Sequence, residues 1–305
     1  GIPAAGAGPR RCPACAGKAA VTPQVVIPFY ERDLCKVGYT AKALAAHDPD
    51  SCFGAILLLW VSTHPSSDYM GPITEIKDSL SETHTVQIID FSKQVVAANK
   101  SSWFAQQVLK LKIASMVSTV YYVVLDAKNT FIRDIDASVF FTPCNQAKIL
   151  AEFRYDQIPK PCAKWYDESA KLLNVSAPTK GYWPSSVAPM VIHTQTALEM
   201  LAAIGEEVST DALCRGPLCS MLSANSVAGF GATEFTLYVL YAYTRTNFGC
   251  THSMERIGQA DLSHRWAVSL RRGTRDDRQA QIKNNLEKCN AIASHRRGAD
   301  MFCSQ

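Results

Sequence analysis

Short apolar runs alternate repeatedly with stretches of helical periodicity along this chain. Runs rich in β-branched residues occupy positions 25–27, 55–61 and 119–125, and helical patterns separate them. This alternation is typical of parallel strands that are joined by crossover helices. Because these runs are almost wholly apolar, we expect these strands, and a further one at 84–89, to be buried on both faces. The sequence therefore predicts an α/β fold of Rossmann type, with a mixed, mostly parallel sheet flanked by helices.

The remaining elements follow from the same patterns and fill the chain without an internal repeat or a long linker. Further strands are predicted at 84–89, 147–153 and 187–193. Helices are predicted over 34–46, from Pro72 onward, over 103–117, within 159–173, and over 196–204 and 234–245. The interval 131–141 is expected to be a broken, partly extended excursion. We therefore expect a flexible leader at 1–22, one domain at 23–270, and a basic C-terminal segment at 271–305 that is helical over 276–293.

The composition is that of a folded domain. Of the 305 residues, 47% are hydrophobic and 19% are charged, which permits a large core and excludes a disordered chain. No run reaches the roughly 18 apolar residues that a bilayer-spanning helix needs. The sequence thus predicts no membrane span within itself. If the natural protein has a membrane anchor, that anchor is not in this sequence.

Positive charge is concentrated after residue 270. From there on, eight Lys and Arg residues stand against four acids, while the whole chain has a net charge of +4. A solvated amphipathic helix is the simplest interpretation, and contact with phosphate or anionic lipid is the alternative. Aromatic residues do not interleave with the basic ones, so we expect no nucleic-acid partner.

Polar residues follow two of the apolar strands at their carboxyl ends, where open parallel sheets bind ligands. The first strand is followed by a polar turn that contains Arg32 and Asp33. The fourth strand is followed by Asp126, Lys128 and Asn129. A carboxylate and an ammonium directly after so apolar a strand predict a phosphate-binding site. An ordinary ion pair on a solvated loop is the alternative.

The predicted helix 103–117 carries a polar flank near the same edge. At helical spacing, this flank is formed by Trp103, Gln106, Gln107 and Lys110. Amides and a lysine are suited to the recognition of hydroxyl and phosphate groups, and a merely solvated face is the alternative. The flank is therefore a candidate lining of the site at Asp126.

Two nucleotide-binding signatures are missing. A dinucleotide-binding fold needs glycines after its first strand so that the backbone can approach a pyrophosphate, and none is present there. The pair Gly229 and Gly231 lacks the third glycine and stands outside the opening βαβ unit, so it predicts a loop hinge. The chain also has no P-loop. These absences disfavour a dehydrogenase and a kinase.

A resemblance to a known family arises at these residues. It rests on five segments: IPFYERDL, WFAQQVLKLKIA, YYVVLDAKNTFIRDI, SVAPMVIHTQTALEMLAAI and GATEFTLYVLYAYTR. In order and spacing they resemble uncharacterised nucleotide-diphospho-sugar glycosyltransferases of the GT-A fold, over residues 25–266. The resemblance implies a GT-A-like sheet and an enzyme, a hexosyl- or pentosyltransferase. It also implies a nucleotide-sugar donor and a glycan or glycosylated acceptor as partners.

The segment Asp126-Ala127-Lys128 matches the place of the DxD motif in GT-A enzymes. The carboxylates of that motif bind a divalent cation, Mn or Mg, which neutralises the donor diphosphate. Here Lys128 replaces the second acid, and an ammonium cannot ligate a metal. Either Asp126 holds a metal with help from a later histidine, such as His252 or His264, or Lys128 takes the place of the cation. We favour the second arrangement, which makes the site independent of metal.

The resemblance also assigns roles to other residues. Glu234 matches an acidic position at a helix start that faces the acceptor and, in inverting enzymes, deprotonates its hydroxyl. The alternative is that Glu234 only complements the helix dipole. By analogy, Asp33 and Arg32 contact the nucleotide base or ribose, and His264 closes over the diphosphate. Gln106, Gln107, Lys110 and Asn129 complete the donor pocket, whereas His193 is expected to be a core histidine.

The missing second acid supports a second hypothesis, in which an inactive GT-A domain binds carbohydrate or nucleotide. Cellular location is left open. We expect the Golgi lumen of the secretory pathway if an anchor was removed, and the cytoplasm otherwise. Sequons at Asn99 and Asn174 permit the first location. Cys12 and Cys15 have zinc-knuckle spacing without a second pair, and a disulfide is predicted between Cys214 and Cys219.

Overall fold

The computed structural model describes residues 21–151, 153–157, 160–184, 188–211, 213–220, 222, 232–256 and 267–269. Several sequence predictions lie outside these residues. They are most of the leader 1–22, the segment 271–305 with its helix, the Cys12–Cys15 pair, the glycines 229 and 231, and His264.

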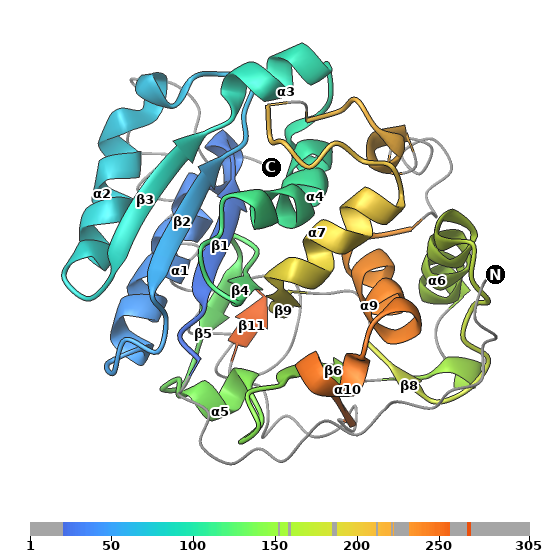
Figure 1. Cartoon of the computed structure of the whole chain (residues 1–305). Coiled ribbons are helices and arrows are strands. Elements are labelled where there is room, and N and C mark those ends of the chain that lie inside the picture. Colours follow the sequence, from blue (N-terminus) through green and yellow to red (C-terminus); the bar gives the residue numbers. More distant parts are fainter. Residues whose placement is uncertain are drawn as a thin grey trace.

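A five-stranded sheet forms the centre of the molecule (Figure 1). Its order is β3 (Thr85–Asp90), β2 (Ala55–Trp60), β1 (Gln24–Phe29), β4 (Tyr121–Val124) and β9 (Met190–His193). The first four strands are parallel, and β9 runs antiparallel to β4. The predicted fold class, a mixed, mostly parallel sheet flanked by helices, is confirmed.

Helices cover both faces of the sheet, which gives three layers. On one face lie α1 (Leu34–His47) and α2 (Met70–Ser81), packed on alternate strand residues such as Val25 and Ile27. On the other lie α4 (Ser102–Lys112), α7 (Thr194–Ala203) and α9 (Glu234–Arg245), packed on Val26 and the residues that share its face. Because neighbouring strand residues point to opposite faces, continuous apolar runs supply both cores.

The remaining elements are short, apart from α6 (Lys160–Leu173), which packs on α9. The short helices are η1 (Glu31–Asp33), η2 (Ser66–Tyr69), α3 (Ser92–Ala98), η3 (Ile113–Ser115), α5 (Ala137–Phe140), η4 (Tyr155–Gln157) and α10 (Phe248–Thr251). The short strands are β5 (Asn129–Phe131), β6 (Ala147–Ala151), β7 (Phe153–Arg154), β8 (Tyr182–Trp183), β10 (His252–Arg256) and β11 (Ala267–Ser269).

Where the structure departs from the sequence predictions, the reasons are local. The predicted strand 147–153 is split into β6 and β7, and the excursion 131–141 contains α5. The expectation of strands buried on both faces is wrong for β3, because β3 is an edge strand whose Thr85, Gln87 and Asp90 are exposed. The helix at Pro72 begins two residues earlier, which leaves the proline in the first turn, where its missing N–H does no harm.

The order of the strands creates a switch point between β1 and β4. From β1 the chain moves outward through β2 and β3, and it then returns through α4 to β4 on the other side of β1. The carboxyl ends of β1 and β4 therefore lie side by side, while their connections leave in opposite directions. Open α/β sheets bind ligands at such a point.

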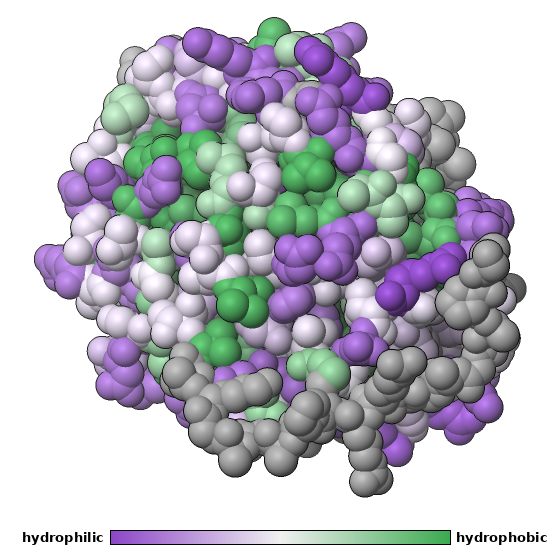
Figure 2. All heavy atoms as spheres, in the orientation of Figure 1, coloured by the Kyte–Doolittle hydropathy of each residue, from purple (hydrophilic) through white to green (hydrophobic). Residues whose placement is uncertain are grey.

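The surface shown in Figure 2 carries hydrophobic residues in separate patches among hydrophilic ones. None of the described helices combines the length and the apolar character needed to cross a bilayer. The predicted disulfide between Cys214 and Cys219 is present, and Cys35, Cys144 and Cys250 are also disulfide-bonded.

A buried carboxylate ties α1 to β3 and to the start of β2. Asp48 accepts hydrogen bonds from His84 Nε2 at 2.7 Å, from the Cys52 N–H at 2.7 Å and from the Phe53 N–H at 3.3 Å. Burial raises the pKa of Asp48, but these hydrogen bonds outweigh it and hold the pKa below the ordinary value. The stabilisation is thus complete above the ordinary Asp pKa of about 4 and is lost as pH falls through the folded-state pKa.

Asp48→Asn is expected to lower the free energy of unfolding at pH 7 by about 1–3 kcal/mol, because an amide cannot accept all three bonds. The variant should also lose less stability than the wild type between pH 4 and pH 2. Urea unfolding at several pH values measures both effects. Asp50→Asn, at an exposed position, is the control. Equal pH dependence in Asp48→Asn and the wild type would contradict this assignment.

Candidate functional site

The loop after β4 is held rigidly at the switch point. The Asp126 N–H donates to Asn129 Oδ1 at 2.6 Å, and the Asn129 N–H donates to the Asp126 carbonyl at 2.9 Å. The Thr40 hydroxyl of α1 donates to the Ala127 carbonyl at 2.8 Å. Asn129 Nδ2 also donates to the Ala188 carbonyl at 3.4 Å. Both ends of the Asn129 amide are thus used inside the chain, and this predicted donor-binding residue shapes the loop.

Lys110 links the loop after β4 to the start of α9. Its Nζ lies 2.8 Å from Asp126 Oδ1 and 3.0 Å from Glu234 Oε1, and only 4% of its side chain is exposed. The Nζ also lies 5.1 Å from the centroid of the Phe235 ring, within cation–π range. The Tyr122 hydroxyl donates to the Lys110 carbonyl at 2.9 Å, which fixes this turn of α4 against β4. One ammonium therefore joins two carboxylates inside the protein.

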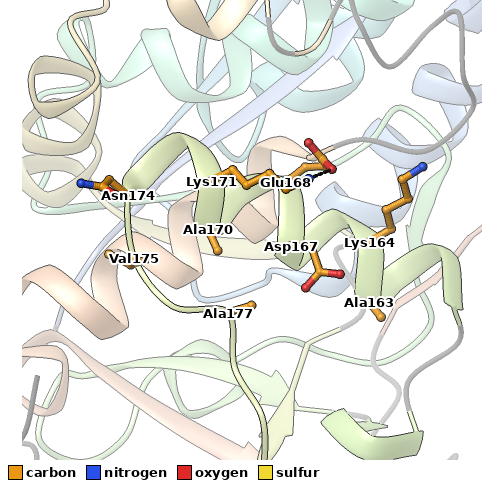
Figure 3. Close-up of a pocket in the computed structure, with 9 residues that line it drawn as sticks. All are labelled: Ala163, Lys164, Asp167, Glu168, Ala170, Lys171, Asn174, Val175 and Ala177. Carbon is orange, nitrogen blue, oxygen red and sulfur yellow. Dashed lines mark hydrogen bonds and ion pairs between the residues drawn. The ribbon is translucent and has the colours of Figure 1, made fainter.

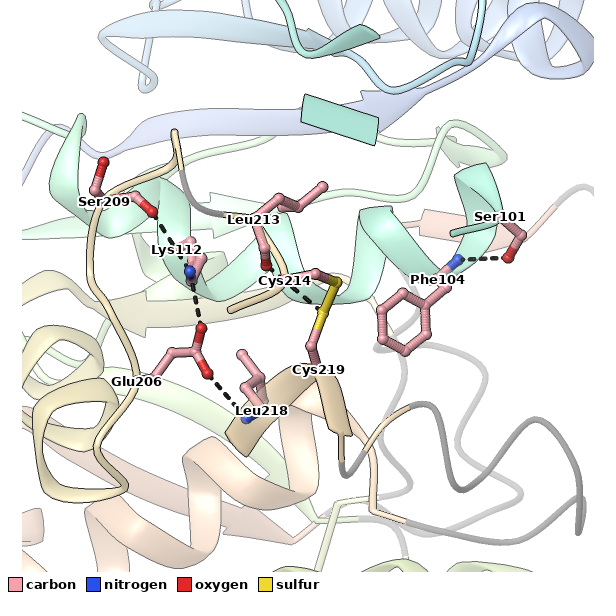
Figure 4. Close-up of a disulfide and its surroundings, with 9 residues drawn as sticks. All are labelled: Ser101, Phe104, Lys112, Glu206, Ser209, Leu213, Cys214, Leu218 and Cys219. Atoms are coloured by element: carbon pink, nitrogen blue, oxygen red, sulfur yellow. Dashed lines mark hydrogen bonds and ion pairs between the residues drawn. A yellow bond between two sulfur atoms is a disulfide. The ribbon is translucent and has the colours of Figure 1, made fainter. Parts of the chain in front are cut away.

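Helix caps place these groups. Ser101 caps α4 by accepting a hydrogen bond from the Phe104 N–H (Figure 4). Thr233 caps α9 through a capping box with Thr236, so Glu234 becomes the first residue of that helix. A carboxylate at that position faces the positive end of the helix dipole. Dipole and ammonium together stabilise the charge of Glu234.

The two carboxyl groups differ in environment. Burial raises the pKa of Glu234 above its ordinary value, although Lys110 opposes this. At Asp126, burial also raises the pKa, but the ammonium groups of Lys110 and Lys128 outweigh it and lower the pKa. Gln107, with its amide nitrogen turned toward Glu234, donates to Oε2 at 2.6 Å. Asp126 is thus the more acidic member of the pair.

Asp33 brings the end of β1 into the same site. Burial raises its pKa, against the opposing effects of Lys36, Gln106 and Lys128. Lys36 donates to Asp33 Oδ1 at 3.1 Å. Gln106 is buried beside Asp33, and its side-chain hydrogen bond to that carboxyl is one of the effects that lower the Asp33 pKa. The Gln106 amide nitrogen has two N–H groups, so one donor remains for a ligand at this end of the sheet.

Lys128, like Lys36, is a partly exposed cation of the site. Its side chain is 36% exposed, and its Nζ lies 3.5 Å from Asp126 Oδ2. It also faces Asp33 closely enough to lower the pKa of that carboxyl. Lys128 therefore stands between the ends of β1 and β4, with part of its surface open to solvent. Lys110, by contrast, is enclosed.

The structure brings together most of the predicted site residues. The residues that lie together at the carboxyl ends of β1 and β4 are Asp33, Gln106, Gln107, Lys110, Asp126, Lys128, Asn129 and Glu234. Arg32 is exposed beside Asp33, and its side chain makes no ion pair or hydrogen bond with the residues that the structure describes. His264 lies outside the described residues. Lys36 was missed, and its spacing of three residues from Asp33 on a helix is the signal that could have found it.

Two histidines, His193 and His252, lie at the other end of the strands, near the amino terminus of β4. His193 pairs with Tyr121 at the start of β4, and its Nδ1 lies 2.9 Å from the Thr196 hydroxyl. His252 Nε2 lies 2.7 Å from the hydroxyl of Tyr238, which accepts from the His193 N–H. Five residues of extended chain, roughly 16 Å, separate Tyr121 from Asp126. His193 is hydrogen-bonded within the chain, as predicted, but it is only partly buried and is therefore not a core histidine.

His252 is therefore not a metal partner of Asp126. Both of its ring nitrogens are engaged, the second by Thr251 Oγ1 at 2.7 Å. Burial lowers the pKa of His252 to about 3, which leaves the ring neutral and fixed in this network. The arrangement in which His252 helps Asp126 to hold a metal is contradicted by this geometry.

The described residues line two hollows away from the site. The larger, of about 880 Å³, runs along α6, where Lys171 pairs with Glu168 at 2.6 Å (Figure 3). The smaller, of about 640 Å³, lies at the amino-terminal edge of β4 beside His193. Neither is lined by a residue of the Lys110–Asp126–Glu234 cluster. The cluster, with its charges buried together, is the stronger candidate for chemistry.

A family model described as "Family of unknown function (DUF6492)" matches residues 42–269, more than half of the chain. No curated protein matches the chain. Among solved structures, the galactosyltransferase LgtC in complex with donor and acceptor sugar analogues is similar with a TM-score of 0.48 and 9% identity, over 88% of this chain and 95% of LgtC. The bifunctional glycosyltransferase WbbM is similar with a TM-score of 0.40 and 13% identity, over 64% of this chain and 36% of WbbM. At these scores and identities, the similarities do not establish a shared activity.

Proposed function

We propose that this chain, which belongs to the family of unknown function DUF6492, is a glycosyltransferase that moves a sugar from a nucleotide-diphospho-sugar donor to an acceptor hydroxyl. The observation that carries the proposal is the meeting of Asp33, Gln106 and Lys128 where β1 and β4 end. A partly exposed ammonium beside a buried amide donor suits a diphosphate, since both groups donate to phosphate oxygens. The sequence resemblance to GT-A enzymes agrees with this assignment.

Each step of the proposed sugar transfer can be assigned to a residue of this site. The bond between the anomeric carbon and the diphosphate oxygen breaks, and a bond to the acceptor oxygen forms. Lys128 would stabilise the negative charge that develops on the departing nucleoside diphosphate. Asp33 would accept a hydrogen bond from a hydroxyl of the nucleotide. The proton of the acceptor hydroxyl would pass to a carboxylate, for which Glu234 is the proposed residue.

The donor site is tested by binding. A nucleoside diphosphate from a panel of common bases is expected to raise the thermal midpoint of the protein, and Lys128→Ala should remove this shift because the ammonium between the ends of β1 and β4 is gone. Lys171→Ala, in the hollow along α6, is the matched control and should keep the shift. If no nucleoside diphosphate shifts the midpoint, with or without manganese, the donor site is not at this edge.

The role of Glu234 is tested by pH. If Glu234 takes the proton of the acceptor, turnover must rise with pH as its carboxyl ionises, at a pH above the ordinary Glu pKa because burial raises that pKa. Glu234→Gln is then expected to lower kcat and to remove this rising limb. Steady-state rates between pH 4 and pH 9 measure both effects. A rising limb that persists in the variant would assign the proton to another group.

A second function is favoured by one observation. The side chain of Glu234 is only 5% exposed and has both Lys110 and Gln107 as partners, which suits a residue that holds a site together. An inactive domain that binds nucleotide or carbohydrate would have this arrangement. Release of nucleoside diphosphate from a panel of nucleotide sugars separates the two functions. Binding without any release would favour the binding module.

A further inference from the structure

We infer that Lys110 acts as a built-in cation at the place where GT-A enzymes bind a divalent metal, so that the donor site works without a metal. This inference deepens the proposed function and rests on it for the identity of the ligand. It adds Lys110 to the sequence-based expectation, in which Lys128 alone took the place of the cation. Its basis is the position of one ammonium between two carboxylates.

The donor groups do not fit a divalent cation. Mg and Mn require about six ligands, mostly oxygens, and a protein site needs carboxylate oxygens that are free to point at the ion. Asp126 Oδ1 and Glu234 Oε1 both point at Lys110 Nζ instead, at 2.8 and 3.0 Å. Among the described residues, no group of three or more His, Cys, Asp or Glu side chains is placed to hold a metal ion. A cation between these carboxylates would have to displace the ammonium.

The charges of the cluster are already balanced. Two carboxylates, Asp126 and Glu234, stand against two ammonium groups, Lys110 and Lys128. Lys110 is enclosed, so its charge is poorly screened by water and would strongly repel a second cation at this short range. A divalent ion would leave the site with excess positive charge. The chain's own lysines thus supply the positive charge that a metal would bring.

The two lysines have different roles because their side chains differ in exposure to solvent. Lys110, 4% exposed, fixes the positions of Asp126 and Glu234 from inside. Lys128, 36% exposed, is held by Asp126 and is free to face a phosphate. Lys110 is therefore a positioning residue, and Lys128 is the group that would touch the ligand. With these two lysines supplying the positive charge, the site needs only the one acid Asp126, whereas the DxD motif has two acids to bind a metal.

The test compares manganese binding in the full-length wild type, Lys110→Met, and the double variant Lys110→Met/Glu234→Gln. Free Mn²⁺ is followed by its electron paramagnetic resonance signal, without nucleotide. The wild type is expected to leave the signal unchanged. Lys110→Met, which leaves two carboxylates facing each other, is expected to bind Mn²⁺ and reduce the signal, and the double variant should bind less. If the wild type binds Mn²⁺ and Asp126→Asn abolishes that binding, the inference is overturned.

A second measurement decides the matter if Lys110→Met fails to fold. The affinity of the wild type for its nucleoside diphosphate is expected to agree within about twofold in EDTA and in excess Mn²⁺. Affinity that requires Mn²⁺ would overturn the inference. If no nucleoside diphosphate binds under either condition, the proposed function fails, while the manganese measurement still judges Lys110.

Discussion

Lys112→Ala is expected to lower the free energy of unfolding by about 3–5 kcal/mol, because it leaves a buried carboxylate without its partner. Lys112 Nζ lies 2.8 Å from Glu206 Oε1, and both side chains are 0% exposed (Figure 4). Glu206 Oε2 also accepts from the Leu218 N–H at 2.9 Å, next to the Cys214–Cys219 disulfide. The pair thus joins the end of α4 to the segment that follows α7.

Chemical denaturation of Lys112→Ala and of two comparison variants checks this expectation. Lys171→Ala breaks an exposed pair with Glu168 and should change the midpoint little, since surface pairs contribute little. The double variant Lys112→Met/Glu206→Leu removes both charges and should recover part of the loss. If the double variant is no more stable than Lys112→Ala, an uncompensated charge is not the cause of the loss.

Lys110→Met is expected to lower kcat by about 100-fold, because a small misplacement of groups at a reacting centre has effects of this size. Without the ammonium, Asp126 and Glu234 repel each other and lose the positions described above. KM for the donor should change much less, since Lys128 stays in place to face the phosphates. Lys128→Ala should show the reverse, with a raised KM as its main effect.

Steady-state kinetics with the donor found in the nucleotide panel separates these effects. Lys110→Arg, which keeps the charge, is expected to recover part of kcat. Thermal unfolding of each variant shows whether the protein is folded at the assay temperature. If Lys110→Met raises KM and leaves kcat unchanged, Lys110 contacts the donor itself and does not act by positioning the carboxylates.

Local patterns predicted much of the architecture. Helix 234–245 was predicted with the bounds of α9, because Thr233 and Glu234 are a start signal before a strongly apolar helix. Helical spacing also predicted that Gln106, Gln107 and Lys110 face the end of the fourth strand. These inferences use residues close together in the sequence. Short-range spacing is what a single sequence reports well.

Contacts between segments that are far apart in the chain could not be predicted from local sequence patterns. Lys110 and Glu234 are 124 positions apart, and only the family resemblance, not the spacing within either segment, placed them in one site. Pairing of His193 with Tyr121 depends on β9 running antiparallel to its neighbour, which a short apolar run does not specify. The Asn129 side-chain amide likewise donates a hydrogen bond to the Ala188 carbonyl, which is 59 positions away in the chain. Each of these features is set by tertiary packing.

A crystal structure of the protein with the nucleoside diphosphate that binds it, grown in EDTA, would locate the donor site and show whether it holds a metal. We expect a diphosphate within hydrogen-bond distance of Lys128 and the Gln106 amide, at the carboxyl ends of β1 and β4, with Lys110 still between Asp126 and Glu234. A diphosphate bound in the hollow along α6, or a metal ion in place of the Lys110 ammonium, would contradict this expectation.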